Sequence, residues 1–196
     1  MSTLVFLDVD GPLIPFGASP RRLPGGYPTY RTTPSDPAAD AHPLLARVNP
    51  AHGPRPAALG CALVWATTWT DDANDSVAPR LGLPALPVVH WPDSDEPHPH
   101  PGLHWKTPSL ITWAAGRPFV WLDDELTEAD RAWVSATHPA PALLHRVDAH
   151  HGLTEADFAA VEEWLREVED TPLSVAGAML GEAERRAGEA PRMNAC

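Results

Sequence analysis

The first thirteen residues, MSTLVFLDVDGPL, constrain the fold of this chain more than any other segment. The apolar run from Leu4 to Leu7 stops abruptly at Asp8, and Asp10 and Gly11 follow at once. Such a run is typical of a strand buried on both faces, as in a parallel sheet. In an extended chain Asp8 and Asp10 point to the same side, and two close like charges favour a bound cation or protonation of one carboxyl group. Open α/β sheets bind ligands at the ends of their strands, so the segment predicts a functional site there.

Strand-like and helix-like segments alternate along the rest of the chain. The other apolar runs that are expected to form strands cover residues 61–66, 86–90, 118–122 and 142–147. Helical periodicity covers residues 40–48, 72–81, 107–115, 128–137 and 154–169. This alternation predicts an α/β fold with three layers and a parallel sheet.

The length of 196 residues fits one domain with a small elaboration. We expect a catalytic domain over residues 1–170. Residues 11–39, rich in Pro and Gly, are expected to form a flap or hairpin with short strands at 13–16 and 29–32. Residues 171–196 lose the periodicity and are expected to form a peripheral helix or tail.

Composition limits the partners and the compartment. The formal net charge of −12 disfavours binding of a long nucleic acid. Cys61 and Cys196 are too few for a disulfide framework, which favours a reducing compartment. The sequence contains no apolar run of the roughly 20 residues that a membrane span requires. We therefore expect a cytoplasmic protein without a membrane partner. The sequence does not indicate the oligomeric state.

Polar residues follow three of the expected strands. Thr67 and Thr68 follow the run 61–66, Asp123 and Asp124 follow the run 118–122, and Lys106 opens the helix before that run. With Asp8 and Asp10, these residues would lie at one edge of a parallel sheet. Clustered carboxylates bind hard cations such as Mg²⁺, and an aspartate can form a covalent aspartyl-phosphate intermediate. The set therefore favours phosphoryl transfer assisted by Mg²⁺.

These segments resemble, in order, the four motifs of the haloacid dehalogenase (HAD) superfamily. The matching stretches are DVDGPL at 8–13, LVWAT at 63–67, Lys106, and VWLDDE at 120–125. The resemblance covers roughly residues 3–147. It implies a Rossmann-like sheet with the five expected strands in the order 5-4-1-2-3. The stretches 40–60 and 68–105 are too short for the large cap domains of this superfamily, so we expect no such cap.

The resemblance also implies catalytic roles. Asp8 would be the nucleophile and Asp10 the general acid and base. Thr67 and Lys106 would bind the phosphoryl group. Thr68 and Gly11 are further candidates for phosphate binding, and the choice between Thr67 and Thr68 stays open.

The implied metal ligands for Mg²⁺ are Asp8, Asp10 (through its backbone carbonyl), Asp123 and Asp124. The expected activity is that of a Mg²⁺-dependent phosphatase acting on a phosphorylated small molecule. One alternative is a phosphatase for nucleotides or nucleic-acid ends. Another is a non-catalytic binding or regulatory module of the same fold.

Two further groups of residues suggest less specific roles. Basic and aromatic residues after the first motif could contact a substrate's phosphate or base, or could form only an exposed turn: Arg21, Arg22, Tyr27, Tyr30 and Arg31. A Pro- and His-rich stretch over residues 90–104 favours an extended solvated loop over a second metal site.

Overall fold

The structure, a computed structural model, describes residues 2–30, 42–92 and 102–170. The chain divides into two compact units, Met1–Glu162 and Glu163–Cys196. The described part of the second unit is the helical stretch 163–170. The expected tail at 171–196 lies outside the described residues, and every site discussed below belongs to the first unit.

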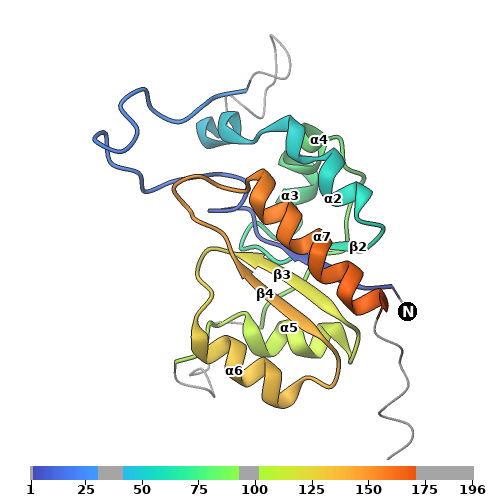
Figure 1. The fold of residues 1–196 in the computed structure, drawn as a ribbon. Helices are drawn as coiled ribbons and strands as arrows, with labels where there is room; N and C mark the ends of the chain where they lie inside the picture. Colours follow the sequence, from blue (N-terminus) through green and yellow to red (C-terminus); the bar gives the residue numbers. More distant parts are fainter. Residues whose placement is uncertain (1, 31–41, 93–101, 171–196) are drawn as a thin grey trace, which may run out of the picture. The chain divides into compact units, whose positions relative to one another are not determined.

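A parallel sheet forms the centre of the first unit (Figure 1). Its strands are β1 (Leu4–Leu7), β2 (Ala62–Trp65), β3 (Phe119–Asp123) and β4 (Ala142–Arg146). They lie in the order β2-β1-β3-β4, and each neighbouring pair is parallel. All residues of β1 are 0% exposed because β1 has a neighbour on each side and is covered on both faces. The predicted α/β fold with a buried first strand is therefore confirmed.

The expected strand over residues 86–90 is not formed, which corrects the predicted order 5-4-1-2-3. In the described part of the chain the sheet has four strands, and Val88 makes only an isolated parallel bridge to Trp65 at the edge of β2. The other four expected strands have the predicted neighbours.

The reason lies in the backbone groups around residue 86. The side chain of Asn74 accepts a hydrogen bond from the backbone N–H of Leu86 at 2.8 Å and donates one to its carbonyl oxygen at 2.9 Å. Pro87 has no N–H to donate to a strand ladder. Contact with β2 is thus limited to the bonds that Pro87 O and Val89 N make with Trp65.

The segment after β1 also differs from expectation. Within residues 13–16, the expected first strand of a hairpin, the structure has only the isolated bridge between Asp10 and Ile14. The expected partner strand, 29–32, extends into residues that the structure does not describe.

The helices match the predicted segments 107–115, 128–137 and 154–169. The predicted helix 40–48 differs, because its described part contains only the 3₁₀ helix Pro43–Arg47. The α-helices are α2 (Pro54–Ala58), α3 (Asp72–Ser76), α4 (Ala78–Leu81), α5 (Thr107–Ala114), α6 (Glu128–Thr137) and α7 (Glu155–Asp170), and the 3₁₀ helices are η1 (Pro43–Arg47) and η2 (Pro50–His52). The expected helix 72–81 is divided at Val77, because Pro79 in the first turn of α4 cannot donate a backbone hydrogen bond. None of the described helices is long and apolar enough to cross a membrane.

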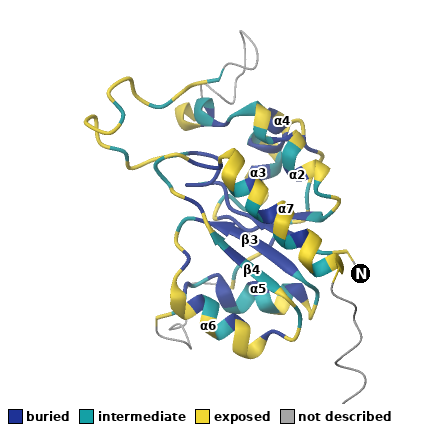
Figure 2. Ribbon diagram, in the orientation of Figure 1, coloured by how far each residue is buried: buried dark blue, intermediate teal, exposed yellow. Residues whose placement is uncertain are grey.

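Helices α5 and α6 cover one face of the sheet (Figure 1). Leu110 and Ala114 of α5 and Val134 of α6 belong to the same buried cluster as Leu4 and Phe6 of β1. Figure 2 shows the resulting pattern, with buried strands and exposed outer sides of the helices. This packing fixes the start of α5, where Lys106 lies, relative to the strand ends.

Candidate active site

The carboxyl ends of β1 and β3 bring the predicted lysine and two predicted aspartates into direct contact. The Nζ atom of Lys106 lies 2.6 Å from Asp8 Oδ2 and 2.8 Å from Asp123 Oδ2. These three residues are 3%, 7% and 0% exposed, respectively. Lys106 is the N-cap residue of α5, 98 residues after Asp8. The fold therefore assembles one ammonium group and two carboxylates in a nearly water-free position.

Burial and charge act against one another in this cluster. Burial raises the pKa of Asp8 to about 7, although the Lys106 ammonium opposes this shift. Burial alone would lower the pKa of Lys106, but the charges of Asp8 and Asp123 outweigh it and raise the pKa. The lysine is thus held in its charged form between the two carboxyl groups.

Asp124 adds a third carboxyl group at the same place. Oxygens of Asp8, Asp123 and Asp124 all lie within 4.8 Å of one another. Burial and the charge of Asp123 raise the pKa of Asp124 to about 6. Three carboxylates with one ammonium leave two negative charges in excess when all are ionised, and hard oxygen donors of this kind suit Mg²⁺. The residues present therefore fit a divalent cation.

Gly11 is required by the position of Asp124. Its φ is +84°, a left-handed conformation that side chains rarely adopt, and a Cβ atom there would overlap the carboxyl group of Asp124. The loop after β1 and the end of β3 can meet only because residue 11 has no side chain. The sequence suggested a phosphate contact for Gly11, whereas the structure places it against a predicted metal ligand.

Trp69 connects the first two motifs. Its indole Nε1–H donates to Asp10 Oδ2 at 3.0 Å, and its backbone N–H donates to Thr67 Oγ1 at 3.3 Å. Thr67 is fully buried at the end of β2, whereas Thr68 is exposed. The carboxyl group of Asp10 is therefore oriented by an indole group, and it does not belong to the cluster of Asp8, Asp123 and Asp124.

His104 connects the lysine to the end of β3, a role that the sequence did not reveal. The backbone N–H of Lys106 donates to His104 Nδ1 at 3.2 Å, so Nδ1 is an acceptor and the neutral ring carries its hydrogen on Nε2. His104 Nε2 lies 3.1 Å from Glu125 Oε2. His104 is buried, so the expectation of a solvated loop over 90–104 fails at this end of the stretch. His98 and His100 lie outside the described residues.

Asp130 of α6 accepts hydrogen bonds from residues on both sides of Lys106. It is 0% exposed, and its carboxyl group accepts hydrogen bonds from the backbone N–H of His104 at 2.8 Å and from Thr107 Oγ1 at 2.7 Å. It also completes a capping box with Thr127. The sequence pattern Thr-x-x-Asp could have indicated this cap. It could not have indicated the contact with His104, 26 residues away.

The parallel sheet and the arrangement of acids and lysine at its carboxyl edge define a protein of the HAD superfamily. In particular, the chain belongs to the family described as the HAD domain in Swiss Army Knife RNA repair proteins, whose model matches residues 4–158. No curated protein and no solved structure matched the chain in the corresponding searches.

Proposed function

We propose that this protein is a Mg²⁺-dependent phosphatase that removes a phosphoryl group from a nucleic-acid end through an aspartyl-phosphate intermediate on Asp8. The observation that carries the proposal is the buried contact of Lys106 Nζ with Asp8 and Asp123. Membership of the HAD family supports action on phosphate esters. The ammonium holds the Asp8 carboxyl group at the sheet edge and supplies positive charge where an anionic phosphoryl group would arrive.

In the first step, a carboxylate oxygen of Asp8 attacks phosphorus, and the ester bond to the leaving oxygen breaks. Asp10 gives its proton to that oxygen, and Trp69 holds the Asp10 carboxyl group in one orientation. Thr67 and Lys106 would bind the remaining phosphoryl oxygens. The burial of Thr67 and the exposure of Thr68 favour Thr67 for this role.

In the second step, water loses a proton to Asp10 and attacks phosphorus. The bond between phosphorus and Asp8 breaks, which releases inorganic phosphate and restores the carboxylate. Mg²⁺ would be held by Asp8, Asp123, Asp124 and the backbone carbonyl of Asp10. Bound Mg²⁺ would offset the negative charge that accumulates around the phosphoryl group.

The family description favours a nucleic-acid end over the small molecule expected from the sequence alone, because it refers to RNA repair proteins. The net charge of −12 still disfavours contact with a long stretch of phosphates. Recognition limited to the end of a strand agrees with both observations. A phosphorylated small molecule remains the second candidate substrate.

Phosphate release tests the proposal. The substrates are short RNAs phosphorylated at the 5′ or the 3′ end, and an aryl phosphate, each with Mg²⁺ or with a chelator. The proteins are the wild type, Asp8→Asn, and Asp75→Asn as a control that removes an exposed carboxylate on α3. We expect metal-dependent release that falls about a thousandfold in Asp8→Asn and is unchanged in Asp75→Asn.

Each other outcome selects an alternative. Release from the aryl phosphate without preference for RNA would favour a small-molecule substrate. If the folded wild type released no phosphate from any ester, the non-catalytic module would replace the proposal.

A further inference from the structure

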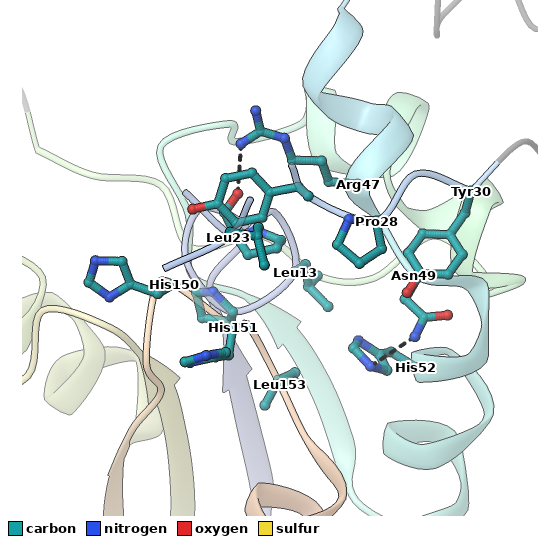
Figure 3. Close-up of a pocket in the computed structure, with 14 residues that line it drawn as sticks. Leu13, Leu23, Pro28, Tyr30, Arg47, Asn49, His52, His150, His151 and Leu153 are labelled. Atoms are coloured by element: carbon teal, nitrogen blue, oxygen red, sulfur yellow. Dashed lines mark hydrogen bonds between the residues drawn. The ribbon is translucent and has the colours of Figure 1, made fainter. Parts of the chain in front are cut away.

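A cavity of about 220 Å³ lies beside the loop that follows β1 (Figure 3). Its lining comes from three segments: residues 12–30, residues 47–52, and residues 150–153 between β4 and α7. Figure 3 shows His150 and His151 on one side, Tyr30 and His52 on the other, and Leu13 among the apolar residues between them. The proposed catalytic residues do not line this cavity.

None of the described residues that line the cavity is acidic, although the chain carries a net charge of −12. Its positive charge comes from Arg47, whose Nη1 donates to the carbonyl oxygen of Pro15 at 2.8 Å. The guanidinium carbon also lies 4.2 Å from the centre of the Tyr27 ring. These two contacts hold the arginine side chain in place at the edge of the cavity. This lining suits a ligand that combines apolar rings with neutral or anionic oxygen atoms.

The two imidazoles at the opposite side are held by one carboxylate. Asp148 lies 2.9 Å from His150 Nδ1 and 3.1 Å from His151 Nδ1. The backbone N–H of His150 also donates to Asp148 and, with the two rings, lowers the pKa of this carboxyl group to about 2. Because a carboxylate only accepts, each Nδ1 carries a hydrogen, and Nε2 of each neutral ring is an acceptor. Such acceptors suit the hydroxyl groups of a sugar.

One turn of backbone separates this cavity from the acidic cluster. Pro12 and Leu13 line the cavity and directly follow Gly11, which packs against Asp124. The carbonyl oxygen of Pro12 accepts a 2.8 Å hydrogen bond from the backbone N–H of Leu153, another lining residue. The cavity and the acidic cluster therefore share the loop that follows β1.

We propose that this cavity binds a nucleoside of the substrate: the base against Tyr30 and Pro28, the sugar hydroxyl groups at His150 and His151, and a phosphate oxygen at Arg47. The identity of the ligand rests on the proposed function, since that function supplies a nucleic-acid end. The binding site itself is separate from the catalytic residues. Tyr30 thus acquires the substrate contact that the sequence suggested, and Tyr27 contacts Arg47. Arg21 and Arg22 lie on the exposed part of the loop and do not line the cavity, and Arg31 lies outside the described residues.

Binding experiments without turnover test this proposal. The protein is the full chain carrying Asp8→Asn, and the probes are adenosine monophosphate and ribose 5-phosphate, which lacks the base. Calorimetry should show about tenfold tighter binding of adenosine monophosphate, because a base stacked on an aromatic ring contributes affinity. Tyr30→Leu should remove this preference, and Arg47→Met should weaken binding of both probes. Arg22→Met removes an exposed arginine of the same loop and should change neither value.

Equal affinity for the two probes, or a preference that survives Tyr30→Leu, would overturn the proposal. Circular dichroism of each variant shows whether a loss of binding reflects unfolding, and His150→Gln provides a second substitution at the opposite side of the cavity. Hydrolysis of the aryl phosphate separates the two proposals. Base-dependent binding without hydrolysis removes the phosphatase assignment only, and Asp8-dependent hydrolysis without base-dependent binding removes the cavity assignment only.

Discussion

The indole of Trp69 donates a 3.0 Å hydrogen bond to Asp10, which places a residue outside the four HAD motifs in contact with the proposed general acid. Trp69→Phe keeps an aromatic ring and removes the donor. We expect kcat for an aryl phosphate to fall about 3- to 10-fold with little change in KM, because a neutral hydrogen bond contributes about 0.5–1.5 kcal/mol.

Trp113→Phe is the matched control for this substitution, since Trp113 packs against Phe6 in the core cluster away from Asp10. Equal kcat values for wild type and Trp69→Phe would show that the contact does not orient Asp10.

Gly11→Ala tests the close approach between the loop after β1 and Asp124. The added Cβ would displace the Asp124 carboxyl group, so we expect at least about a tenfold loss of activity and weaker Mg²⁺ dependence. Gly26→Ala is the control, because Gly26 also has a positive φ, +73°, but has no atom within 4 Å of the added carbon. Both variants carry the strain of a left-handed alanine, about 1–2 kcal/mol, whereas only the first should lose activity. A similar loss in both variants would attribute the effect to backbone strain.

Asp130→Asn tests the hydrogen bonds that hold the segment around Lys106 against α6. The substitution places an amide donor among groups that already donate to Asp130, namely His104 N, Thr107 Oγ1 and Thr127 N. We expect the free energy of unfolding in urea to fall by about 2–3 kcal/mol. Glu128→Gln, an exposed change in the first turn of the same helix, should cost less than about 0.5 kcal/mol. A loss as small as that of the control would mean that Asp130 does not hold this segment.

Asp157 gives a pH dependence with a definite sign. Burial acts to raise its pKa, but hydrogen bonds from Thr154 and His145 outweigh burial and lower it. At pH values between the lowered pKa of folded Asp157 and the ordinary aspartate pKa of about 4, the unfolded chain binds more protons than the folded chain. The ionised Asp157 carboxylate therefore stabilises the folded chain above about pH 4, and this stabilisation is lost as the pH falls through that range.

Urea unfolding between pH 5 and pH 3 measures this contribution. The wild type should lose more stability over this range than Asp157→Asn, whereas Asp75→Asn should follow the wild type. Parallel curves for wild type and Asp157→Asn would contradict the prediction.

Addition of Mg²⁺ should raise the melting temperature, because a cation held by Asp8, Asp123 and Asp124 binds the folded chain in preference to the unfolded one. At a concentration of 100 times Kd, the expected stabilisation is about 2.7 kcal/mol. Asp124→Asn should reduce the shift, and Asp72→Asn, an exposed acid on α3, should not. An equal shift in all three proteins would indicate nonspecific ion binding.

Sequence patterns predicted most of the architecture where the local signal was strong. The run Leu4–Leu7 forms the buried central strand, and the segments predicted for α5, α6 and α7 match to within a residue or so. The strand expected at 86–90 failed because Asn74, twelve residues earlier, hydrogen-bonds the backbone of Leu86. Such a contact depends on where a helix is placed, and a hydrophobic pattern does not contain that information.

The sequence by itself determined that acids, hydroxyl groups and a lysine would gather at one sheet edge, because parallel strands present their carboxyl ends on the same side. Only the tertiary structure decided which side chains meet there. The contacts are Lys106 with both Asp8 and Asp123, Trp69 with Asp10, Gly11 with Asp124, and Asp130 with the backbone N–H of His104. The two contacts of Lys106 alone join residues that are 17 and 98 positions apart. Spacing along the chain does not encode side-chain distances of that kind, whereas the packing of helices on a common sheet fixes them.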